Sequence, residues 1–410
     1  MKTDYLTPVT GGQTALPVII AYPDWRSMLV VLLSYGLGVD SSVILTRWLL
    51  DPTSRDFPLS ALTVVTSMVG NEFPDSKELV EKHLLPLMRE AGVRYVQLGK
   101  EGPTSKDWVV LSDSRETDTL YMEGGGFTLE DESFFTGTNP QYGGIRKCSL
   151  KFKGDVLDPW MEKDLGQTNF RHVMGFNADE PRRVLKDKSF SRASRLSEYP
   201  LVEWGWGREK CESYLEETFG EPWAKSCCYF CPFANNRDGI EAHMARLAKY
   251  PKLAAKGMLM ERITEALNPR QFLFAKKGWG DDFQATVENY GQTEALKAFE
   301  QLLAETEWAV YRVRRLWAGK TSAQRSLVAE ATGTRAEMEA KLAELAATLG
   351  VEVTEAQRTK VLYLADKPEE FPGVEELYAV CPAVPKDKQS KTFEEKWEAA
   401  TPKRRLPLVA

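Results

Sequence analysis

A chain of 410 residues is long enough for two or three domains, and its 43% apolar and 27% charged residues are typical of a globular protein with a large core. A net charge of −6 excludes a protein basic enough to coat nucleic acid over its whole surface, although a local basic patch is compatible with it. No apolar run reaches the roughly 18 residues that a membrane-spanning helix needs.

Residues 1–27 contain Gly11, Gly12 and several prolines, and we expect an irregular N-terminal lead-in. They have no long apolar segment behind a basic start, so a secretory signal is not expected. Six cysteines in a chain of this length, four of them in or near motifs, fit the reducing cytoplasm and a metal site better than disulfides. We therefore expect a cytoplasmic protein.

The stretch from Met28 to Asp51 predicts a strand, a glycine-rich loop and a helix. Residues 28–33 are continuously apolar, as in a strand buried on both faces of a parallel sheet, and apolar residues return at helical spacing after residue 42. Backbone N–H groups at a helix start attract an anion, and glycines let a phosphate approach closely. The loop therefore predicts phosphate binding, with an ordinary serine-capped turn as the alternative. Its candidate ligand contacts are Ser34, Gly36, Gly38, Asp40, Ser41 and Ser42.

Two common phosphate motifs are absent from this loop. No Lys follows Gly38, which excludes G-x-x-x-x-G-K-[ST], and Ser41 occupies the third glycine position of G-x-G-x-x-G. The loop instead resembles the PP-loop of the adenine-nucleotide α-hydrolase group, which includes ATP pyrophosphatases and phosphoadenosine phosphosulfate reductases. That family's loop is approximately S-x-G-G-x-D-S, and Leu37 replaces one family glycine here.

Further apolar runs at 62–67 and 93–98, with a helical pattern at 77–91 between them, predict a doubly wound, mainly parallel α/β sheet. The resemblance implies that this is the HUP-like fold of the α-hydrolases. Ligands of such sheets bind beyond the carboxyl ends of the strands.

The segment GNEFP at 70–74 resembles the T-G-x-E-x-P segment of the sulfate-activating reductases, which implies that Glu72 contacts the nucleotide. From the residues alone, Glu72 is better explained as a solvated loop residue or a helix cap.

Residues 100–145 are rich in Gly, Ser, Thr and Asp, and both a binding loop and a disordered insertion are consistent with them. The basic segment 146–153 follows. Basic residues beside a cysteine such as Cys148 favour a reactive thiolate and supply charge for a polyphosphate, although a helix start with an inward-packed cysteine explains the pattern equally well. The related family has an R-x-C-[ST]-x-x-x-K-type segment here, which implies that Lys151 contributes to the site.

The predicted strand 170–176 ends at NADEPRR, which resembles the family's G-x-x-x-D-E-x-x-R segment. The resemblance implies that Asp179 and Glu180 face the nucleotide and help to hold Mg²⁺, and that Arg182 or Arg183 neutralises phosphates. Without the resemblance, an Asp-Glu-Pro sequence usually forms only a turn. The residues up to Arg195 form a basic patch that would contact ATP, a nucleic-acid backbone or a protein partner, or belong to a solvated loop. The patch consists of Arg182, Arg183, Lys186, Lys188, Arg192 and Arg195, with Asp187 as its one acid.

The segment YPLVEW at 199–204 matches the family's Y-P-L-x-x-W, and a cysteine-rich turn follows at 226–233. Its C-x-x-C spacing brings two thiolates onto one ion, as in zinc and iron–sulfur sites. Relatives with iron–sulfur clusters join distant cysteines, which implies a similar cluster here, whereas Zn²⁺ or buried thiols without a metal are the alternatives. The four candidate ligands are Cys148, Cys227, Cys228 and Cys231.

From about residue 251 the pattern changes. The segments 252–267, 292–318, 321–331, 334–349 and 354–365 have helical periodicity. We therefore expect the α-hydrolase domain to span 28–250, a helical accessory domain to span 251–375, and a tail to span 376–410. The accessory domain is either structural or binds a partner or substrate.

Three functions follow from the resemblance. The first is an ATP-dependent enzyme that releases pyrophosphate and adenylates a substrate for sulfur transfer, with Asp40, Lys151 and Arg182 or Arg183 in catalytic roles. No general base is evident, since the three histidines lie outside the motifs. The second is a sulfonucleotide reductase, which ranks lower because the late cysteine Cys381 has no adjacent histidine. The third is a non-catalytic nucleotide-binding subunit of a defence or mobile-element complex.

Overall fold

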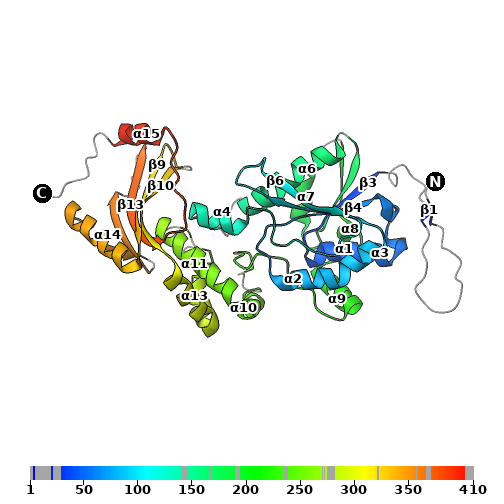
Figure 1. The fold of residues 1–410 in the computed structure, drawn as a ribbon. Helices are drawn as coiled ribbons and strands as arrows, with labels where there is room; N and C mark the ends of the chain where they lie inside the picture. Colours follow the sequence, from blue (N-terminus) through cyan, green and yellow to red (C-terminus); the bar gives the residue numbers. More distant parts are fainter. Residues whose placement is uncertain are drawn as a thin grey trace. The chain divides into compact units, whose positions relative to one another are not determined.

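A computed structural model describes residues 3–4, 20–21, 29–140, 146–166, 168–189, 194–234, 239–269, 271, 273–274, 282–320, 323–356, 358–365 and 371–401. The chain forms two compact units (Figure 1). Unit 1 contains Met1–Leu129 and Lys147–Cys228, and unit 2 contains Glu130–Arg146 and Tyr229–Ala410. The expected boundary at residue 250 is wrong, because the C-terminal part of unit 2 begins at Tyr229, and the earlier segment Glu130–Arg146 also belongs to unit 2. Most of the predicted lead-in lies outside the described residues, apart from the paired strands β1 (Thr3–Asp4) and β2 (Ile20–Ala21).

Unit 1 is an α/β structure, as the alternation of strands and helices predicted. Its described residues form a six-stranded sheet of order β6-β5-β4-β3-β7-β8. The strands are parallel except for β6, which runs antiparallel to β5. The strands are β3 (Val30–Ser34), β4 (Leu62–Ser67), β5 (Arg94–Lys100), β6 (Trp108–Ser114), β7 (Phe170–Met174) and β8 (Arg195–Glu198).

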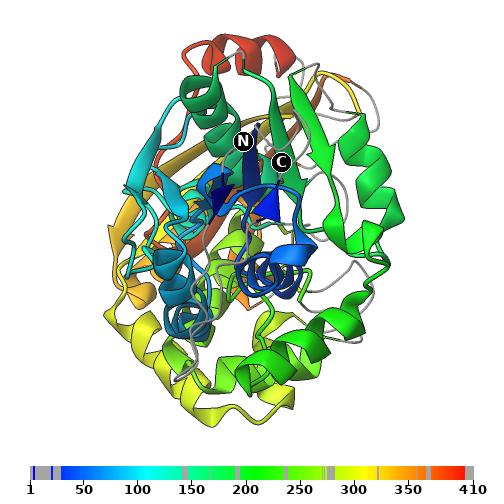
Figure 2. The same ribbon diagram turned by 90° about the vertical axis from the view of Figure 1, so that its right-hand side faces the viewer.

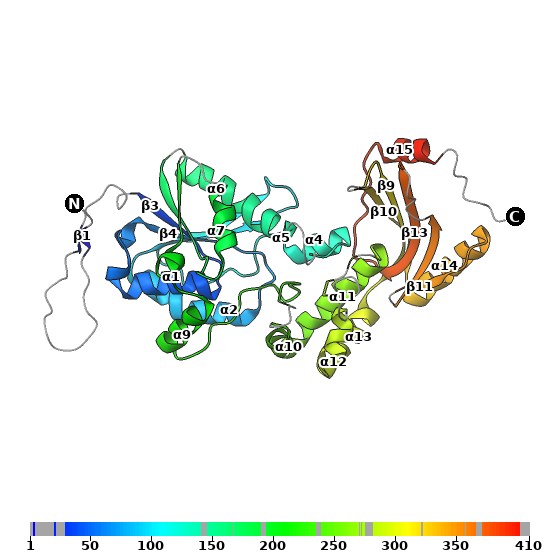
Figure 3. The same ribbon diagram turned by 180° about the vertical axis from the view of Figure 1, so that it is seen from behind.

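Helices cover both faces of this sheet (Figures 1 and 3). Figure 2 shows one of them, α1, nearly end-on. The helices α6 (Asp155–Leu165) and α7 (Pro181–Lys188) lie on one face. The other face is covered by α1 (Val39–Leu50), α2 (Pro74–Leu79), the π-helical turn Val80–Leu84, α3 (Leu85–Glu90), α8 (Pro200–Glu203) and α9 (Arg208–Phe219).

The central strands are apolar on both sides because each face has its own core. Along β3, Val31 and Leu33 pack in the cluster that contains α1, whereas Leu32 packs with Val156 and Trp160 of α6. This alternation explains why the sequence of β3 is a continuous apolar run. The chain leaves β3 toward β4 and later returns to pair β7 on its other edge. The carboxyl ends of β3 and β7 therefore form a topological switch point, where the connections diverge to the two sides of the sheet.

The polar segment after β5 is more ordered than its composition suggested. It contributes the edge strand β6 and the helix α4 (Leu129–Thr136), almost all of which belongs to unit 2. The short helix α5 (Lys147–Ser149) leads back into unit 1. The residues between 141 and 145 lie outside the described part of the chain.

Unit 2 is not the mostly helical domain that the sequence predicted, and residues 376–401 of the predicted tail belong to its fold. The last nine residues of the predicted tail lie outside the described residues. Its described residues contain a five-stranded antiparallel sheet of order β10-β9-β13-β12-β11. The predicted helices at 252–267 and 334–349 are present, whereas 321–331 and 354–365 lie mainly in strands, and 292–318 is a helix followed by a strand. The strands are β9 (Trp308–Trp317), β10 (Ala323–Gly333), β11 (Thr354–Ala356), β12 (Thr359–Ala365) and β13 (Gly373–Pro382).

Non-local ion pairs explain why β9 was mistaken for a helix. Its three arginines break the alternation of a typical strand, but acidic residues from β13 and α15 pair with them. Arg315 is directly opposite Glu375 and forms an ion pair with it. Arg312 donates to Glu376 at 2.7 Å, and Arg314 binds Glu394. The helices of unit 2 beyond α4 are α10 (Ile240–Ala248), α11 (Pro251–Leu267), α12 (Phe283–Asn289), α13 (Thr293–Glu305), α14 (Arg335–Leu349) and α15 (Phe393–Ala400).

The contact between α11 and α12 gives a test of this packing. A Cβ atom at Gly257 would lie 1.9 Å from Cε1 of Phe283. Gly257→Ala is therefore expected to lower the free energy of unfolding of unit 2 by about 1–3 kcal/mol, although alanine is the better helix former. Urea unfolding measures the change. The double variant Gly257→Ala/Phe283→Leu is expected to recover part of the loss, and a stabilised Gly257→Ala protein would contradict the packing.

Candidate functional site

The predicted phosphate loop and the segment after β7 meet at the switch point of unit 1. The closest approach is at Gly175, where a Cβ atom would lie 2.9 Å from the backbone nitrogen of Ser41. Only glycine allows the end of β7 to lie this close to the first turn of α1. Two segments that are far apart in sequence and were each singled out by a motif are therefore direct neighbours in the fold.

The loop has free space next to Gly36, and hydrogen bonds within the loop hold its backbone in place. Gly36 is exposed, and no described heavy atom lies within 4 Å of the position that its Cβ would occupy. Its N–H donates to Ser41 Oγ at 3.2 Å, and that hydroxyl donates to the carbonyl of Gly38 at 3.3 Å. Gly38 is the extended residue before α1. The loop is therefore held by its own hydrogen bonds, with free space above Gly36.

Buried side chains support the loop from below. Tyr35 and Leu37 are each only 2% exposed and belong to the core under α1, so they do not block the loop. Ser42 is also fully buried, and its hydroxyl pairs with Tyr35 Oη at 3.2 Å. Ser42, although predicted to contact a ligand, therefore lies behind the loop.

Leu37 has a backbone conformation that glycine adopts more readily than leucine does. Its φ is +60°, in the left-handed region that ordinary residues avoid. The carbonyl of Leu37 accepts a hydrogen bond from Trp223 Nε1 at 3.1 Å. Burial of the leucine side chain and this hydrogen bond offset the strain, so the loop keeps a glycine-like bend without the glycine.

A polar group joins α1, the turn after β7 and the start of α9. Asp40 accepts from Asn177 Nδ2 at 3.2 Å and faces Arg208 Nη1 at 3.4 Å. Asp179 Oδ2 accepts from the backbone N–H of Arg208 at 2.7 Å and so caps α9. Burial raises the pKa of Asp40, and the charge of Arg208 opposes that rise. Asn177 and Arg208 were not predicted as site residues; Asn177 lay within a quoted motif, but Arg208 had no motif of its own.

The other predicted nucleotide-facing residues have partners of their own. Glu180 forms an ion pair with Arg183 at 2.7 Å, and the guanidinium of Arg183 lies 4.3 Å from the centre of the Phe176 ring. Arg182 is exposed on α7. Of the basic patch, Arg192 lies outside the described residues and Arg195 turns inward, as described below. The exposed described cations of the patch are Arg182, Arg183, Lys186 and Lys188.

Glu72 stabilises the turn that contains it. It accepts from the N–H groups of Val69 at 3.4 Å and Asn71 at 3.1 Å, and burial raises its pKa while Lys153 opposes the rise. These acceptors belong to the turn before α2 and not to the start of the helix, so Glu72 is neither a solvated loop residue nor a cap of α2, and its contact with a nucleotide stays a prediction. Nearby, Ser67 Oγ donates to the carbonyl of Phe152 at 2.5 Å, which ties the segment around Lys151 to the carboxyl end of β4.

The predicted metal ligands are divided between the units. Cys148, Cys227 and Cys228 belong to unit 1, and Cys231 belongs to unit 2. The backbone of Cys228 pairs with that of Glu72 in an isolated β-bridge. Among the described residues, no three or more His, Cys, Asp or Glu side chains are grouped in a way that would hold a metal ion. The iron–sulfur or zinc cluster therefore stays a prediction, and so does Mg²⁺ binding by Asp179 and Glu180.

One histidine outside every motif lies at the loop. His172, on β7, pairs through Nε2 with Ser34 Oγ at 2.8 Å. Burial, reinforced by the positive charge of Arg195, lowers the pKa of His172 to about 3. Its position could not be inferred from the sequence because it depends on the pairing of β3 with β7.

Comparisons with known proteins give no family for this chain. It matches no family model, and no curated protein or solved structure matches it significantly. In the described residues, no helix combines the length and the apolar character needed to cross a bilayer. The function is therefore argued from the residues and their geometry.

The bend at Leu37 predicts an unusual order of stability. At most positions a glycine variant of a protein is less stable than the alanine variant by about 0.5–1 kcal/mol. At a φ of +60°, however, the alanine variant keeps the backbone strain and the glycine variant does not. Both Leu37→Ala and Leu37→Gly lose a buried side chain, and we expect the glycine variant to be the more stable by about 1 kcal/mol. Urea unfolding of unit 1, followed by tryptophan fluorescence, measures both. If the alanine variant is the more stable, the left-handed bend is wrong.

The low pKa of His172 predicts a pH dependence of stability. Between its folded pKa of about 3 and its unfolded pKa of about 6.5, the unfolded state binds more protons, so stability falls as the pH falls through this range. From pH 7 to pH 5 the wild type is expected to lose about 2 kcal/mol more than His172→Gln, which lacks the titrating group. Urea unfolding at both values measures this difference. Equal losses in the two proteins would contradict a buried neutral imidazole.

Proposed function

We propose that this protein is a PP-loop enzyme of the adenine-nucleotide α-hydrolase type, which binds ATP at the β3–β7 switch point and releases pyrophosphate to adenylate a substrate. The supporting observation is the open backbone at Gly36, directly before the start of α1. A sulfur nucleophile then attacks the carbon of the adenylated substrate, the bond from that carbon to the AMP oxygen breaks, and AMP leaves with the electron pair, as the resemblance to sulfur-transfer members of the superfamily implies.

Phosphate chemistry suits this position. The first-turn N–H groups of α1 have no helical acceptors and lie at the positive end of the helix dipole, so they favour an anion. Ser34 adds a hydroxyl at the same edge, and the guanidinium of Arg208 adds a positive charge beside Asp40. These features together favour a polyphosphate over a neutral ligand.

In the proposed reaction, a substrate oxygen attacks the α-phosphorus of ATP. The bond from the α-phosphorus to the bridging oxygen breaks, and pyrophosphate leaves with the electron pair. Loop N–H groups, Arg208 and the predicted cations Lys151, Arg182 and Arg183 would stabilise the negative charge that grows on the leaving group. Mg²⁺ neutralises further phosphate charge when it accompanies ATP.

The reductase alternative is disfavoured by the environment of Cys381. This cysteine is fully buried in β13 of unit 2, and burial raises the pKa of its thiol well above the usual range. A thiol that stays protonated inside a sheet is a poor nucleophile. The alternative of a non-catalytic subunit predicts ATP binding without turnover. We include three further expectations in this proposal. The protein is cytoplasmic, its cysteines bind a cluster, and the exposed cations of α7 bind a nucleic-acid or protein partner.

The decisive experiment places a methyl group above the loop. Gly36→Ala introduces neither a clash nor a left-handed strain, but its methyl group occupies the space proposed for phosphate. We expect the wild type to bind Mg-ATP and release pyrophosphate, and Gly36→Ala to bind at least about tenfold more weakly. Calorimetry measures binding, and a coupled pyrophosphate assay measures turnover.

Gly319→Ala is the matched control, since no described atom lies within 4 Å of a Cβ at this position either, and it belongs to unit 2. It should bind ATP like the wild type, and both alanine variants should unfold at the wild-type urea concentration. If Gly36→Ala binds ATP as tightly as the wild type, the nucleotide does not bind at this loop. Binding without pyrophosphate release would favour the non-catalytic subunit, and sulfite release from an adenylylated sulfate would favour the reductase.

A further inference from the structure

A chain of four polar side chains runs inward from the loop across three strands. Ser34 Oγ, at the end of β3, lies 2.8 Å from His172 Nε2 on β7. On the far side of the ring, Arg195 Nε on β8 donates to His172 Nδ1 at 2.7 Å. Arg195 Nη2 in turn donates to both carboxylate oxygens of Asp187, at 2.8 and 3.1 Å. Tyr199 Oη also donates to Asp187, at 2.8 Å.

The arginine determines the tautomer of the imidazole. A guanidinium Nε always carries a hydrogen, so His172 Nδ1 must be unprotonated to accept from it. The single hydrogen of the neutral ring is therefore on Nε2, and it points at Ser34 Oγ. Because His172 is deeply buried beside a permanent positive charge, the doubly protonated form is disfavoured and does not disturb this arrangement.

The direction of the serine hydroxyl follows from that tautomer. Ser34 Oγ accepts the hydrogen bond from the ring, so its own hydrogen cannot point back at His172. Ser34 is half-buried at the carboxyl end of β3, directly before the open loop. The Ser34 hydroxyl hydrogen is therefore available to donate to an anion at the loop. Because His172 Nε2 always carries the hydrogen of the neutral ring, Ser34 cannot become the donor to His172 instead.

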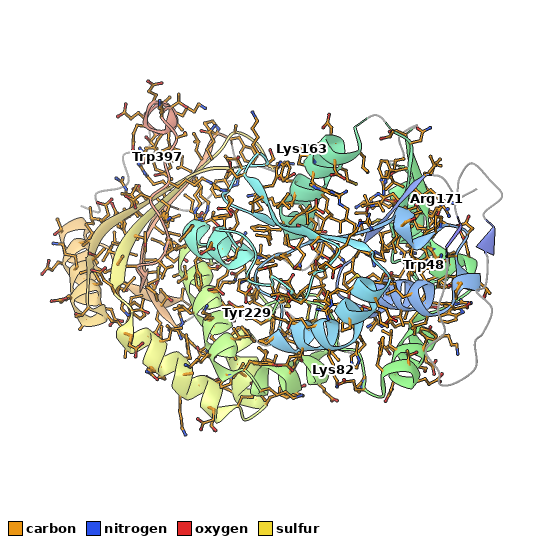
Figure 4. All side chains as sticks on the ribbon, turned by 45° about the vertical axis from the view of Figure 1, so that its right-hand side comes forward. Trp48, Lys82, Lys163, Arg171, Tyr229 and Trp397 are labelled. Atoms are coloured by element: carbon orange, nitrogen blue, oxygen red, sulfur yellow. The ribbon has the colours of Figure 1, made fainter. Side chains whose placement is uncertain are left out.

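The anchoring of Arg195 makes the arrangement rigid. The side chains of Arg195 and Asp187 are only 15% and 13% exposed, so the ion pair is shielded from solvent. The adjacent Arg171 lies on the opposite face of β7 from His172, where Glu198 and Asp56 bind it, and does not compete for Asp187. Figure 4 labels Arg171 among the side chains of unit 1. Two arginines of the predicted basic patch therefore have different roles. Arg195 is part of the internal chain of polar side chains, whereas Arg182 is exposed.

We propose that His172 is a positioning residue, which, with Arg195 and Asp187 behind it, fixes the Ser34 hydroxyl as a hydrogen-bond donor to a phosphate of the bound nucleotide. This inference rests on the proposed function and adds to it a relay that none of the sequence motifs contains. A hydroxyl that is already oriented loses less entropy on binding than one that must choose among rotamers. The relay should therefore affect phosphate recognition and leave recognition of the nucleoside unchanged.

The test compares Mg-ATP and adenosine as ligands in calorimetry. Ser34→Ala removes the donor, and we expect about a tenfold loss of Mg-ATP affinity with no change for adenosine. His172→Leu removes the group that orients it and should give a loss of similar size. His172→Gln keeps an N–H donor near the position of Nε2 and should stay within about threefold of the wild type. The double variant Ser34→Ala/His172→Leu should bind Mg-ATP no more weakly than Ser34→Ala alone, because both changes act on one hydrogen bond.

Three results would overturn the relay while leaving the proposed function in place. They are wild-type Mg-ATP affinity in His172→Leu, additive losses in the double variant, and an equal loss of adenosine binding. If His172→Leu fails to fold, the other two variants still test the relay. Unchanged Mg-ATP affinity in Ser34→Ala, or a tenfold loss of Mg-ATP affinity in His172→Gln, would contradict it. If the wild type binds no Mg-ATP at all, the proposed function and the relay fail together.

Discussion

The close approach of β7 to the first turn of α1 is the contact on which the candidate site depends. With no side chain at Gly175, the end of β7 reaches the backbone of Ser41, and everything else at the switch point follows from that distance. Asn177 can then reach Asp40, and the turn carries Asp179 to the start of α9. A larger residue at this glycine would collide with the backbone and Cβ of Ser41 and so separate the loop from the turn after β7.

The same pairing explains which parts of unit 1 could be predicted. The strand, loop and helix from Val30 to Leu50 are adjacent in sequence, so glycine spacing and apolar periodicity were sufficient to predict them. The order of the strands was not available from such patterns. For that reason His172 was set aside as a histidine without a motif, although β3–β7 pairing brings it to Ser34. Arg208 was missed because its role depends on how α9 packs beside α1.

Unit 2 shows the opposite case, where a local pattern misled. The arginines of β9 gave the sequence the mixed polar and apolar spacing of a helix face. Their partners, Glu375 and Glu376, are about sixty residues further along the chain, and only the antiparallel pairing of β9 with β13 brings them together. Charged residues inside a sheet are stable when each has such a partner, and that condition cannot be judged from periodicity.

The placement of α4 also has a consequence for how this protein is made. The chain passes from one unit to the other three times, after Leu129, after Arg146 and after Cys228. The early segment is built into unit 2, since Glu130 binds Lys256 at 2.9 Å and Thr136 accepts from Arg325 at 2.6 Å. During synthesis, α4 leaves the ribosome long before the strands that will hold it. A single cut after residue 228 would keep all of unit 1 but would separate α4 from the rest of unit 2, and nearly the whole chain must be synthesised before unit 2 can close.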